Sequence, residues 1–541
     1  MPASETNTER SADSADELAI EQLEYSLSFL ADWERLVSVE FVGLSTVEDP
    51  TRIKKSRSAV HQMQRLSKAE HSMEIGLRGA AMAAVALNQT EQREEFLLYE
   101  TLFGRDSLRV AQNVMELYPK LARTTLVALA EHQGTVRDEM REEQPGKIIH
   151  EYRDPEFDPI AQRLTEEKGW GWPYYGAVDS TIHYIHALRA YIQACDDGLT
   201  DETADEFLAQ PIKADVKPER SMANSLEGAV HWLERKLDEN PQHIVEYQRV
   251  NRQGIENQVW KDSWDSYFHD DGSLASHEKG IASIEVQGLA YDALLDAAEL
   301  YDQRGGLDTE AARLRQRADD LRAAVHELFW VDDDGGYFAL GTDRDEQGNL
   351  RQLKIKTSNM GHVLNSRLLE GDDPRTVERR EALVEQLFTP EMQNVSGIRT
   401  LASDEARFKP GAYHNGSVWL WDTNYIAQGL ERHGYLLLAD DIRKKVSNVV
   451  EATSMFPEFV RGDFAEEPRV NQHIIDIYDE ELGKGNRIEQ PPQQVQAWTV
   501  SAILYIKHHV VLHQAQLKQH LASDSETLDF EQKVRVQLSA T

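Results

Sequence analysis

Apolar residues recur at helical spacing along most of this 541-residue chain. In one stretch after another they fall three or four positions apart, which places them on a single face of a helix. The spacing predicts helices at 106–117, 120–132, 178–194, 222–237, 284–301, 309–328, 360–368, 377–388, 418–433, 435–453 and 495–509. Strand-like segments such as 336–340 occur only locally. We therefore expect an all-α protein.

The predicted helices follow one another in pairs, separated by long polar or aromatic loops. The sequence contains no glycine fingerprint of a Rossmann domain or a P-loop, and no HExxH motif. A single toroid of helical hairpins, with its functional loops gathered at one end, accounts for this order better than a fold built on a sheet.

The charge balance narrows the range of partners. Asp and Glu number 94 against 58 Lys and Arg, which gives a net charge of −36. A surface this negative repels phosphate backbones and anionic lipids, so we expect no nucleic-acid and no membrane partner, whereas a neutral carbohydrate is unaffected. Cys195 is the only cysteine, which excludes an intrachain disulfide and a zinc cluster of cysteines. The polar, acidic start of the chain and the lack of long apolar runs predict a cytoplasmic protein.

The segment 258–272 concentrates the most unusual chemistry. It includes Trp260, Lys261, Asp262, Trp264 and Asp265, in a pattern that fits neither an amphipathic helix nor a strand. Sugar rings stack on aromatic faces while their hydroxyls bond to charged groups or amides, so this segment suits a sugar site. The simpler alternative is a solvated acidic loop whose indoles reach the core.

Further loops combine aromatic, amide and charged residues, at 169–180, 413–422, 456–459 and 496–498. Arg105 and Asp106 stand at the start of the predicted helix 106–117, where an Asp can serve as an N-cap but where such a pair can also hold two hydroxyls of one sugar. Glu458 follows a proline and lies between Phe456 and Phe459. A carboxyl among apolar groups has a raised pKa and a fixed position, although an exposed Glu at a helix end would show the same pattern.

Eight motifs occur in the order found in one known family: LFGRDS (102–107), PGKIIHE (145–151), PYYGAVD (173–179), WKDSWDS (260–266), IRTLASDE (398–405), YHNGSVW (413–419), FPEF (456–459) and QAW (496–498). From about residue 98 to 510 the chain resembles the glucosidase domain of glycogen debranching enzymes, the bacterial amylo-α-1,6-glucosidase group. It is more distantly similar to the mannosyl-oligosaccharide glucosidases. The resemblance implies an (α/α)6 barrel and an inverting exo-glycosidase with two catalytic carboxyls.

The resemblance also implies roles for individual residues. Asp262 matches the general acid and Glu458 the general base, while Arg105 and Asp106 match the pair that holds the terminal glucose. The remaining substrate-binding candidates are Trp172, Tyr174, Tyr175, Asp179, Lys261, Trp264, Asp265, Tyr413, His414, Asn415, Trp419, Gln496 and Trp498. No cofactor and no metal is expected, because the acidic loops at 269–272 and 332–336 lack EF-hand spacing.

Physical chemistry agrees with these roles. In an inverting enzyme one carboxylic acid protonates the leaving oxygen while a carboxylate on the opposite face activates water, with the two groups about 6.5–9.5 Å apart. Burial against the neighbouring indoles and repulsion from Asp265 would keep Asp262 protonated, and Lys261 would oppose this if it points inward. Asp265 is the reserve candidate for the acid.

These expectations divide the chain into a disordered tail (1–16), a helical N-terminal extension (17–97), a catalytic domain (98–515) and a C-terminal tail (516–541). The N-terminal β-domain of debranching relatives and a second domain for glucan transfer are absent from this pattern. The predicted activity is hydrolysis of a terminal α-glucosyl unit from an oligosaccharide or a small glucoside, with glucosylglycerol-like solutes as an alternative.

Three other functions remain open. A phosphorylase on a similar barrel would bind phosphate where Glu458 stands, and a second carboxylate there opposes it. An isomerase would move a proton with a histidine such as His150, His183, His186 or His414. A glycan-binding protein would keep the aromatic loops without needing both Asp262 and Glu458.

Overall fold

The computed structural model describes residues 101–539, except 157, 213–219, 473–474, 480–483, 494–495 and 524. The predicted tail at 1–16 and the predicted helical extension at 17–97 lie outside the described residues. Within the described part the protein is all-α, as the sequence predicts, and its strands are short. No helix in this part is both long and apolar enough to span a bilayer.

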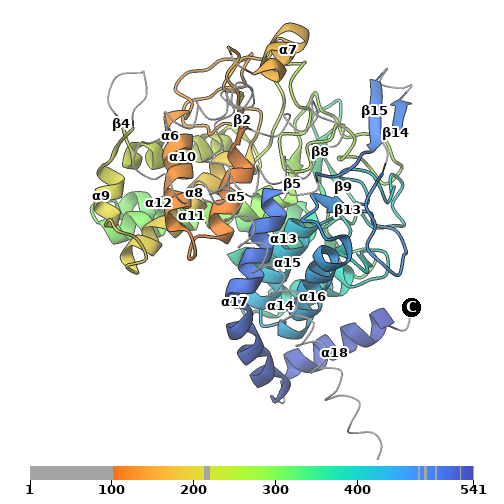
Figure 1. Cartoon of the computed structure of the whole chain (residues 1–541). Helices are drawn as coiled ribbons and strands as arrows, with labels where there is room; N and C mark the ends of the chain where they lie inside the picture. The colour runs from red at the N-terminus through yellow and green to blue at the C-terminus, as the bar shows by residue number, and fades with distance from the viewer. Residues whose placement is uncertain are drawn as a thin grey trace, which may run out of the picture.

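A closed ring of helices forms the centre of the fold, and Figure 1 labels its members. Each of its members packs on the next, and the last packs on the first. In ring order they are α5 (Gly104–Asn113), α8 (Asp179–Asp196), α11 (Ile284–Arg304), α13 (Asn359–His362), α15 (Leu420–Arg432) and α17 (Ala497–Leu521). After α13 the chain tightens into the 3₁₀ turns η2 (Val363–Asn365) and η3 (Arg367–Leu369).

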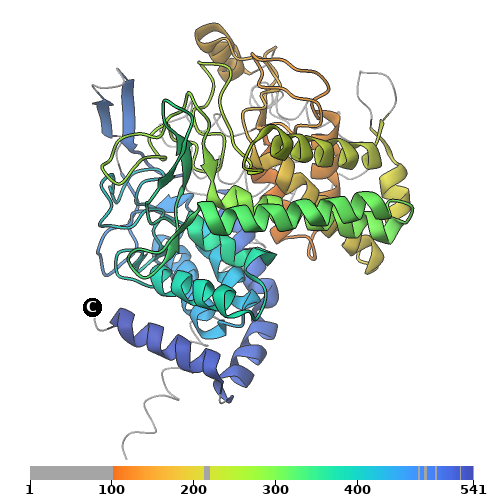
Figure 2. The same cartoon turned by 180° about the vertical axis from the view of Figure 1, so that it is seen from behind.

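A second layer of helices covers the outside of this ring. The outer helices α6 (Pro119–Glu131), α10 (Met222–Glu239), α12 (Asp308–Leu328), α14 (Pro374–Leu387) and α16 (Leu436–Thr453) pack on α5, α8, α11, α13 and α15 respectively. Figure 2 shows α12 as a long green helix across the back of the molecule. The ring of six inner helices and its outer layer, of which five helices lie among the described residues, form the (α/α)6 toroid that the sequence predicts.

The strands are short pairs, and several of them anchor the beginning of an inner helix. β1 (Leu102–Phe103) pairs with β2 (Glu151–Tyr152) just before α5, and β12 (Val418–Trp419) pairs with β13 (Phe459–Val460) just before α15. Before α11, β5 (Ala282–Ser283) joins β8 (Gly341–Arg344) and β9 (Leu350–Leu353). The other strands are β3 (Pro211–Ile212), β4 (Arg220–Ser221), β6 (Trp330–Val331), β7 (Tyr337–Phe338), β10 (Gln393–Asn394), β11 (Gly397–Ile398), β14 (Ile475–Asp479) and β15 (Lys484–Glu489).

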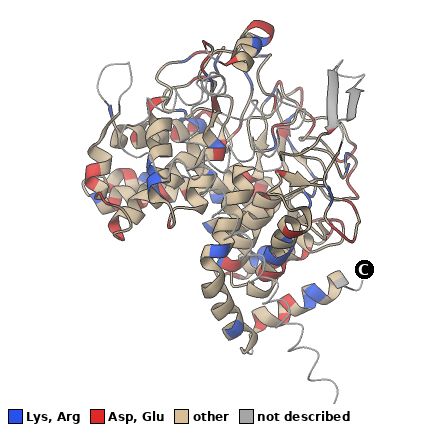
Figure 3. Cartoon of the chain, viewed as in Figure 1, with Lys and Arg blue, Asp and Glu red and all other residues tan. Residues whose placement is uncertain are grey.

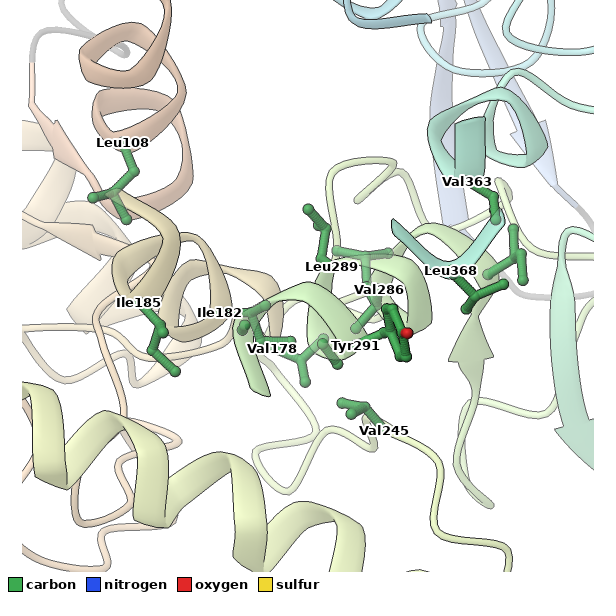
Figure 4. Packing of buried hydrophobic residues seen from close by; sticks show 14 of the residues in the cluster. Leu108, Val178, Ile182, Ile185, Val245, Val286, Leu289, Tyr291, Val363 and Leu368 are labelled. Carbon is green, nitrogen blue, oxygen red and sulfur yellow. The ribbon is translucent and has the colours of Figure 1, made fainter. Parts of the chain in front are cut away.

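The apolar stripes predicted from the sequence form the core between the layers. Leu108 of α5, Ile182 and Ile185 of α8, and Val286 of α11 belong to one buried cluster (Figure 4). Side-chain caps define where several helices start: Ser221 and Asn224 form a capping box on α10, and Gln496 caps α17. Charged residues are spread over helices and loops of the described part of the chain (Figure 3).

The helix bounds depart from the sequence predictions mainly near the C-terminus. The predicted helix at 495–509 continues to Leu521, and the segment predicted as a tail also contains α18 (Glu526–Ser539), which packs on α16. Leu437, Leu517 and Leu528 form a small buried cluster there, and Val534 of α18 belongs to the main core. The short helices α7 (Pro159–Lys168) and α9 (Ala204–Ala209) were not predicted.

One close approach within the ring gives a stability test. A Cβ on Gly429 of α15 would lie 2.7 Å from the backbone nitrogen of Asn365 and 2.8 Å from the carbonyl carbon of Leu364, so Gly429→Ala forces helix and turn apart. We expect a loss of about 1–3 kcal/mol in the free energy of unfolding, measured by urea denaturation. Gly288→Ala in α11 is the matched control, because its Cβ meets Ser366 at an ordinary 3.4 Å. An equal loss in both variants would contradict this account.

Candidate active site

Three inner helices bring their N-terminal ends together. Arg105 and Asp106 lie in the first turn of α5, Asp179 begins α8, and Trp498 lies in the first turn of α17. The Arg105 Nε donates to the Asp179 Oδ2 at 2.6 Å, and both side chains are almost fully buried. The Trp498 Nε1 donates to the backbone oxygen of Asp106 at 3.2 Å. The ring therefore assembles residues that are about 390 positions apart in the chain.

The loop that carries Asp262 is held from both sides. At its start the Gln258 carbonyl accepts from the Val178 amide at 2.8 Å, which ties the loop to the beginning of α8. Within the loop the Ser266 Oγ donates to the carbonyl of Lys261 at 2.6 Å. On the other side the Ser263 hydroxyl bonds to the His414 Nδ1 at 2.7 Å. Asp262 is thus positioned by its neighbours, and its own side chain stays partly accessible.

Glu458 is held beside the beginning of α15. The β12–β13 pairing places Trp419 opposite Phe459, the residue after Glu458. The Glu458 carboxylate accepts from the Tyr413 hydroxyl at 2.5 Å and from the Gln493 amide at 3.1 Å. Only 3% of Glu458 is exposed, so this carboxyl is a fixed group of the interior.

Both carboxyls have strongly raised pKa values. Burial raises the pKa of Asp262 to about 7; Asp106 and Asp179 add to the rise, while Arg105 opposes it. Burial also raises the pKa of Glu458 to about 7, against the hydrogen bonds from Tyr413 and Gln493. Asp106 contributes to the rise at both residues, and burial raises its own pKa to about 6. The charge of Asp106 acts on both carboxyls, so the three acids form one electrostatic unit.

An aromatic cluster borders this unit. His414 stacks on Trp419 with 5.4 Å between the ring centroids, and the Trp419 Nε1 donates to the carbonyl of Tyr413 at 2.8 Å. Trp421 lies 4.7 Å from Trp498 and 5.0 Å from Trp260. Of the predicted site aromatics, Trp419 and Trp498 belong to one buried cluster with Trp260, Trp421 and Phe459, and Tyr413 packs against this cluster.

The sequence analysis did not include Trp421, His362 and Asp422 in the site. The His362 Nε2 bonds to the Asp422 Oδ1 at 2.5 Å, and the His362 ring stacks on Trp260. Trp421 and Asp422 lie just beyond the YHNGSVW motif, at the end of the 413–422 loop named in the sequence analysis, but neither was chosen as a site residue. His362 carries no local signal, because only the packing of α13 against α15 brings it there.

Several buried polar atoms in this region have no hydrogen-bond partner among the described residues. They are the Arg105 Nη2, the Asp179 Oδ1, the Trp260 Nε1, the Trp421 Nε1 and the Asp422 Oδ2. Buried polar atoms are nearly always hydrogen-bonded in folded proteins. Donors and acceptors that the protein itself leaves unmatched are suited to the hydroxyls of a bound sugar or to water.

Some predicted site residues act within the protein instead. The Lys261 ammonium donates to the Thr400 carbonyl and lies near the face of Trp260, and burial lowers the pKa of Lys261 to about 7. The Asn415 amide donates to the backbone oxygen of Asp265 at 3.0 Å. These residues support the loop that carries Asp262.

The remaining predicted residues are also placed by local contacts. The Gln496 Oε1 accepts from the Trp498 amide at 2.7 Å as the cap of α17. Trp264 is partly buried in the loop of Asp262, and its Nε1 has no partner among the described residues. Asp265 lies 4.0 Å from an Arg407 nitrogen, and burial raises its pKa while Arg407 opposes the rise.

The aromatic residues of the 169–180 loop face the protein interior more than was expected. Tyr174 is fully buried, stacks on Trp170, and accepts from the Ile255 amide at 3.0 Å. The Tyr175 hydroxyl donates to the His132 carbonyl at 2.8 Å, and the Trp172 Nε1 donates to Thr165. The hydroxyls of Tyr174 and Tyr175 and the indole nitrogen of Trp172 form hydrogen bonds that hold this loop. We therefore leave these three residues out of the substrate-binding set proposed below.

Residues 177–466 match the family model described as the mannosylglycerate hydrolase MGH1-like glycoside hydrolase domain, which is more than half of the chain. The chain belongs to this family. The protein is therefore a glycoside hydrolase, and its substrate is a carbohydrate. The match does not single out the debranching enzymes to which the motifs pointed, so the resemblance holds at the level of α/α-toroid glycoside hydrolases.

Solved structures similar to this chain include the GH63 mannosylglycerate hydrolase from Thermus thermophilus. Its complex with Tris and D-glycerate has 14% identity and a TM-score of 0.49, covering 79% of this chain and 99% of that one. Its complex with glucose has 13% identity and a TM-score of 0.43 over the same shares. An uncharacterized conserved protein from the same organism has 13% identity and a TM-score of 0.45, again over 79% and 99%. No curated protein matches the chain.

The hydrogen bond from Tyr413 to Glu458 gives a test of the site's electrostatics. It lowers the pKa of Glu458, so Tyr413→Phe should raise that pKa. If the enzyme needs ionised Glu458, the acidic limb of the kcat/KM profile moves to higher pH, by up to about one unit. Tyr175→Phe is the matched control, because its hydroxyl bonds to His132. An acidic limb that stays in place in Tyr413→Phe would contradict the assignment.

Proposed function

We propose that the protein is an inverting exo-acting glycoside hydrolase in which Asp262 is the general acid and Glu458 the general base. The observation that supports this most directly is the pair of carboxyls with pKa values near 7, on separate loops and joined electrostatically by Asp106. A general acid must hold its proton near neutral pH, and a general base must accept one there. A carboxyl with a pKa near 7 can do either at neutral pH, because both its protonated and its ionised form are present there.

The proposed reaction is a single displacement. Asp262 gives its proton to the glycosidic oxygen while the bond from that oxygen to the anomeric carbon breaks. A water molecule attacks the anomeric carbon from the opposite face, and Glu458 takes a proton from that water. One water is consumed, the sugar and the aglycone are released, and proton exchange with solvent returns both carboxyls to their starting states.

The pair Arg105 and Asp106 is proposed to hold the sugar that is released. The Arg105 Nη2 and the Asp179 Oδ1 have no hydrogen-bond partner among the described residues, so one donor and one acceptor are available for sugar hydroxyls. The indoles of Trp419 and Trp498 border the same region. The same surroundings favour Asp262 over Asp265 as the acid, because Arg105 and Asp106 both act on Asp262, whereas Arg407 faces Asp265.

The proposed substrate is a small α-glycoside, in which one sugar is linked to a polyol or a small hydroxy acid. The family match supports this, since the family is described by a mannosylglycerate hydrolase. A terminal α-glucosyl unit of an oligosaccharide is the second candidate, supported by the eight motifs shared with debranching glucosidase domains. Glucosylglycerol is a small glycoside of a polyol, as in the first candidate, and its sugar is glucose, as in the second.

A proton-transferring isomerase is less well supported by the histidines. Burial lowers the pKa of His150, His183 and His414 well below the ordinary value, so they are poor bases at neutral pH. His186 bonds to Asp296 and to the Leu289 carbonyl on α11. The His414 Nδ1 bonds to the Ser263 hydroxyl, so His414 supports the loop that holds Asp262.

Amide substitutions test the two carboxyls directly. Asp262→Asn should lower kcat by at least about 10²-fold, because an amide cannot protonate the leaving group, and Glu458→Gln should do the same by removing the base. Azide is expected to restore turnover in Glu458→Gln only. Steady-state kinetics and circular dichroism measure activity and fold.

Two further variants serve as controls. Asp265→Asn should keep most of the activity, and so should Glu405→Gln, which removes a partly buried carboxyl that accepts from the Lys356 amide and whose pKa burial raises to about 7. Full activity in Asp262→Asn, with loss in Asp265→Asn, would move the acid to Asp265.

The stereochemistry and the substrate are tested together by proton NMR of the first-formed product. The purified protein is incubated with mannosylglycerate, glucosylglycerate, glucosylglycerol, isomaltose, maltose and a branched limit dextrin. We expect the β-anomer of the sugar from one of the first three. Initial release of the α-anomer would exclude inversion, and preference for isomaltose or the limit dextrin would support the second candidate. If no sugar is released without phosphate, and a sugar 1-phosphate and the free aglycone form when phosphate is added, the protein is a phosphorylase.

A further inference from the structure

A separate group of titratable side chains lies where the ring of helices closes. Glu116 is in the turn that follows α5, and His508 and His509 are on α17, the helix that packs on α5. His508 is ten residues beyond Trp498, about 15 Å along the helix from the candidate active site. The proposed hydrolysis uses none of these three residues.

The three side chains converge on one point. The Nε2 atoms of His508 and His509 lie 3.0 and 3.6 Å from the same oxygen of Glu116, Oε2. Bound zinc lies about 2.0–2.2 Å from nitrogen and oxygen ligands, so two ligands of a tetrahedral ion are about 3.4 Å apart. The observed separations bracket that value. An ion could enter between the three atoms with only small side-chain movements.

A contact outside the group orients one of the ligands. The Nδ1 of His509 lies 2.9 Å from the carbonyl of Tyr505. A carbonyl oxygen can only accept, so this nitrogen carries the proton and the lone pair is on Nε2, which faces Glu116. Histidines that bind metals are commonly oriented in this way, through the nitrogen that does not bind the ion.

We propose that Glu116, His508 and His509 form a site for one divalent transition-metal ion, of which Zn²⁺ is the best fit. Two imidazoles and one carboxylate suit zinc, whereas Mg²⁺ and Ca²⁺ prefer sets of oxygen ligands. The side chains are exposed to 34% at His508, 18% at His509 and 58% at Glu116, so an ion can reach them and water can fill the fourth position.

Such an ion would join the two ends of the toroid. α5 and α17 already share the hydrogen bond from the Asn113 amide to the Ser501 hydroxyl at 3.1 Å. A metal bound by the turn after α5 and by α17 adds a second link at this closure. Because it binds only the folded arrangement, it stabilises the native state in proportion to its concentration and affinity. Its role is structural and independent of the proposed hydrolysis.

The test uses the full chain with any polyhistidine tag removed, treated with EDTA and desalted. Isothermal titration with Zn²⁺ should show one saturable equivalent, and the melting temperature should rise by a few degrees with Zn²⁺ but not with Mg²⁺. Co²⁺ should give the visible absorption of a four-coordinate ion.

Variants locate the binding. His509→Gln and Glu116→Gln should each lose the saturable equivalent and the thermal shift while keeping the melting temperature of the metal-free protein. His231→Gln, at an exposed histidine on α10, should keep both. No saturable zinc binding, or binding that persists in both His509→Gln and Glu116→Gln, would overturn the proposal. Glycosidase activity is not the readout, so a failed hydrolysis assay leaves this test intact.

Discussion

The buried ion pair between Arg105 and Asp179 is the interaction on which the candidate site depends. It joins the first turns of α5 and α8, and its charges act on Asp106 and Asp262. Without the guanidinium, three carboxyls would stand close together with no positive charge to offset them. Leaving one partner of a buried pair unmatched costs about 3–5 kcal/mol, so the pair constrains both the fold and the chemistry.

The toroid supplies a further reason for acids to gather at this end. The first turns of α5, α8, α11 and α15 contain Asp106, Asp179, Glu285 and Asp422 respectively. Helix N-termini carry partial positive charge and unpaired amide groups, which favour carboxylates there. A ring of inner helices thus collects acidic side chains around its centre, and the loops that precede the helices bring in Asp262 and Glu458.

The raised pKa values of the carboxyls have a cost in stability. Asp262 and Glu458 release their protons near pH 4 in the unfolded chain and near pH 7 in the folded protein. Between these values the unfolded chain binds fewer protons, so the contribution of both residues to stability falls as the pH rises from about 4 to about 7. Stability given up at an active site is commonly recovered by packing elsewhere, here in the core between the two helical layers.

The sequence by itself determined the helical class, most helix positions and the loops that hold the candidate residues Asp262 and Glu458. These follow from local spacing, because a residue's neighbours at three and four positions decide which face of a helix is apolar. The tertiary structure alone decided which side chains meet. In the folded protein Tyr174 and Lys261 point into the interior, and the His362 ring stacks on Trp260. The tertiary structure also placed Asp106 within reach of both Asp262 and Glu458, and Glu116 against α17. The spacing of apolar residues predicts that one face of a helix is buried. Which element packs against that face depends on how the ring of helices closes.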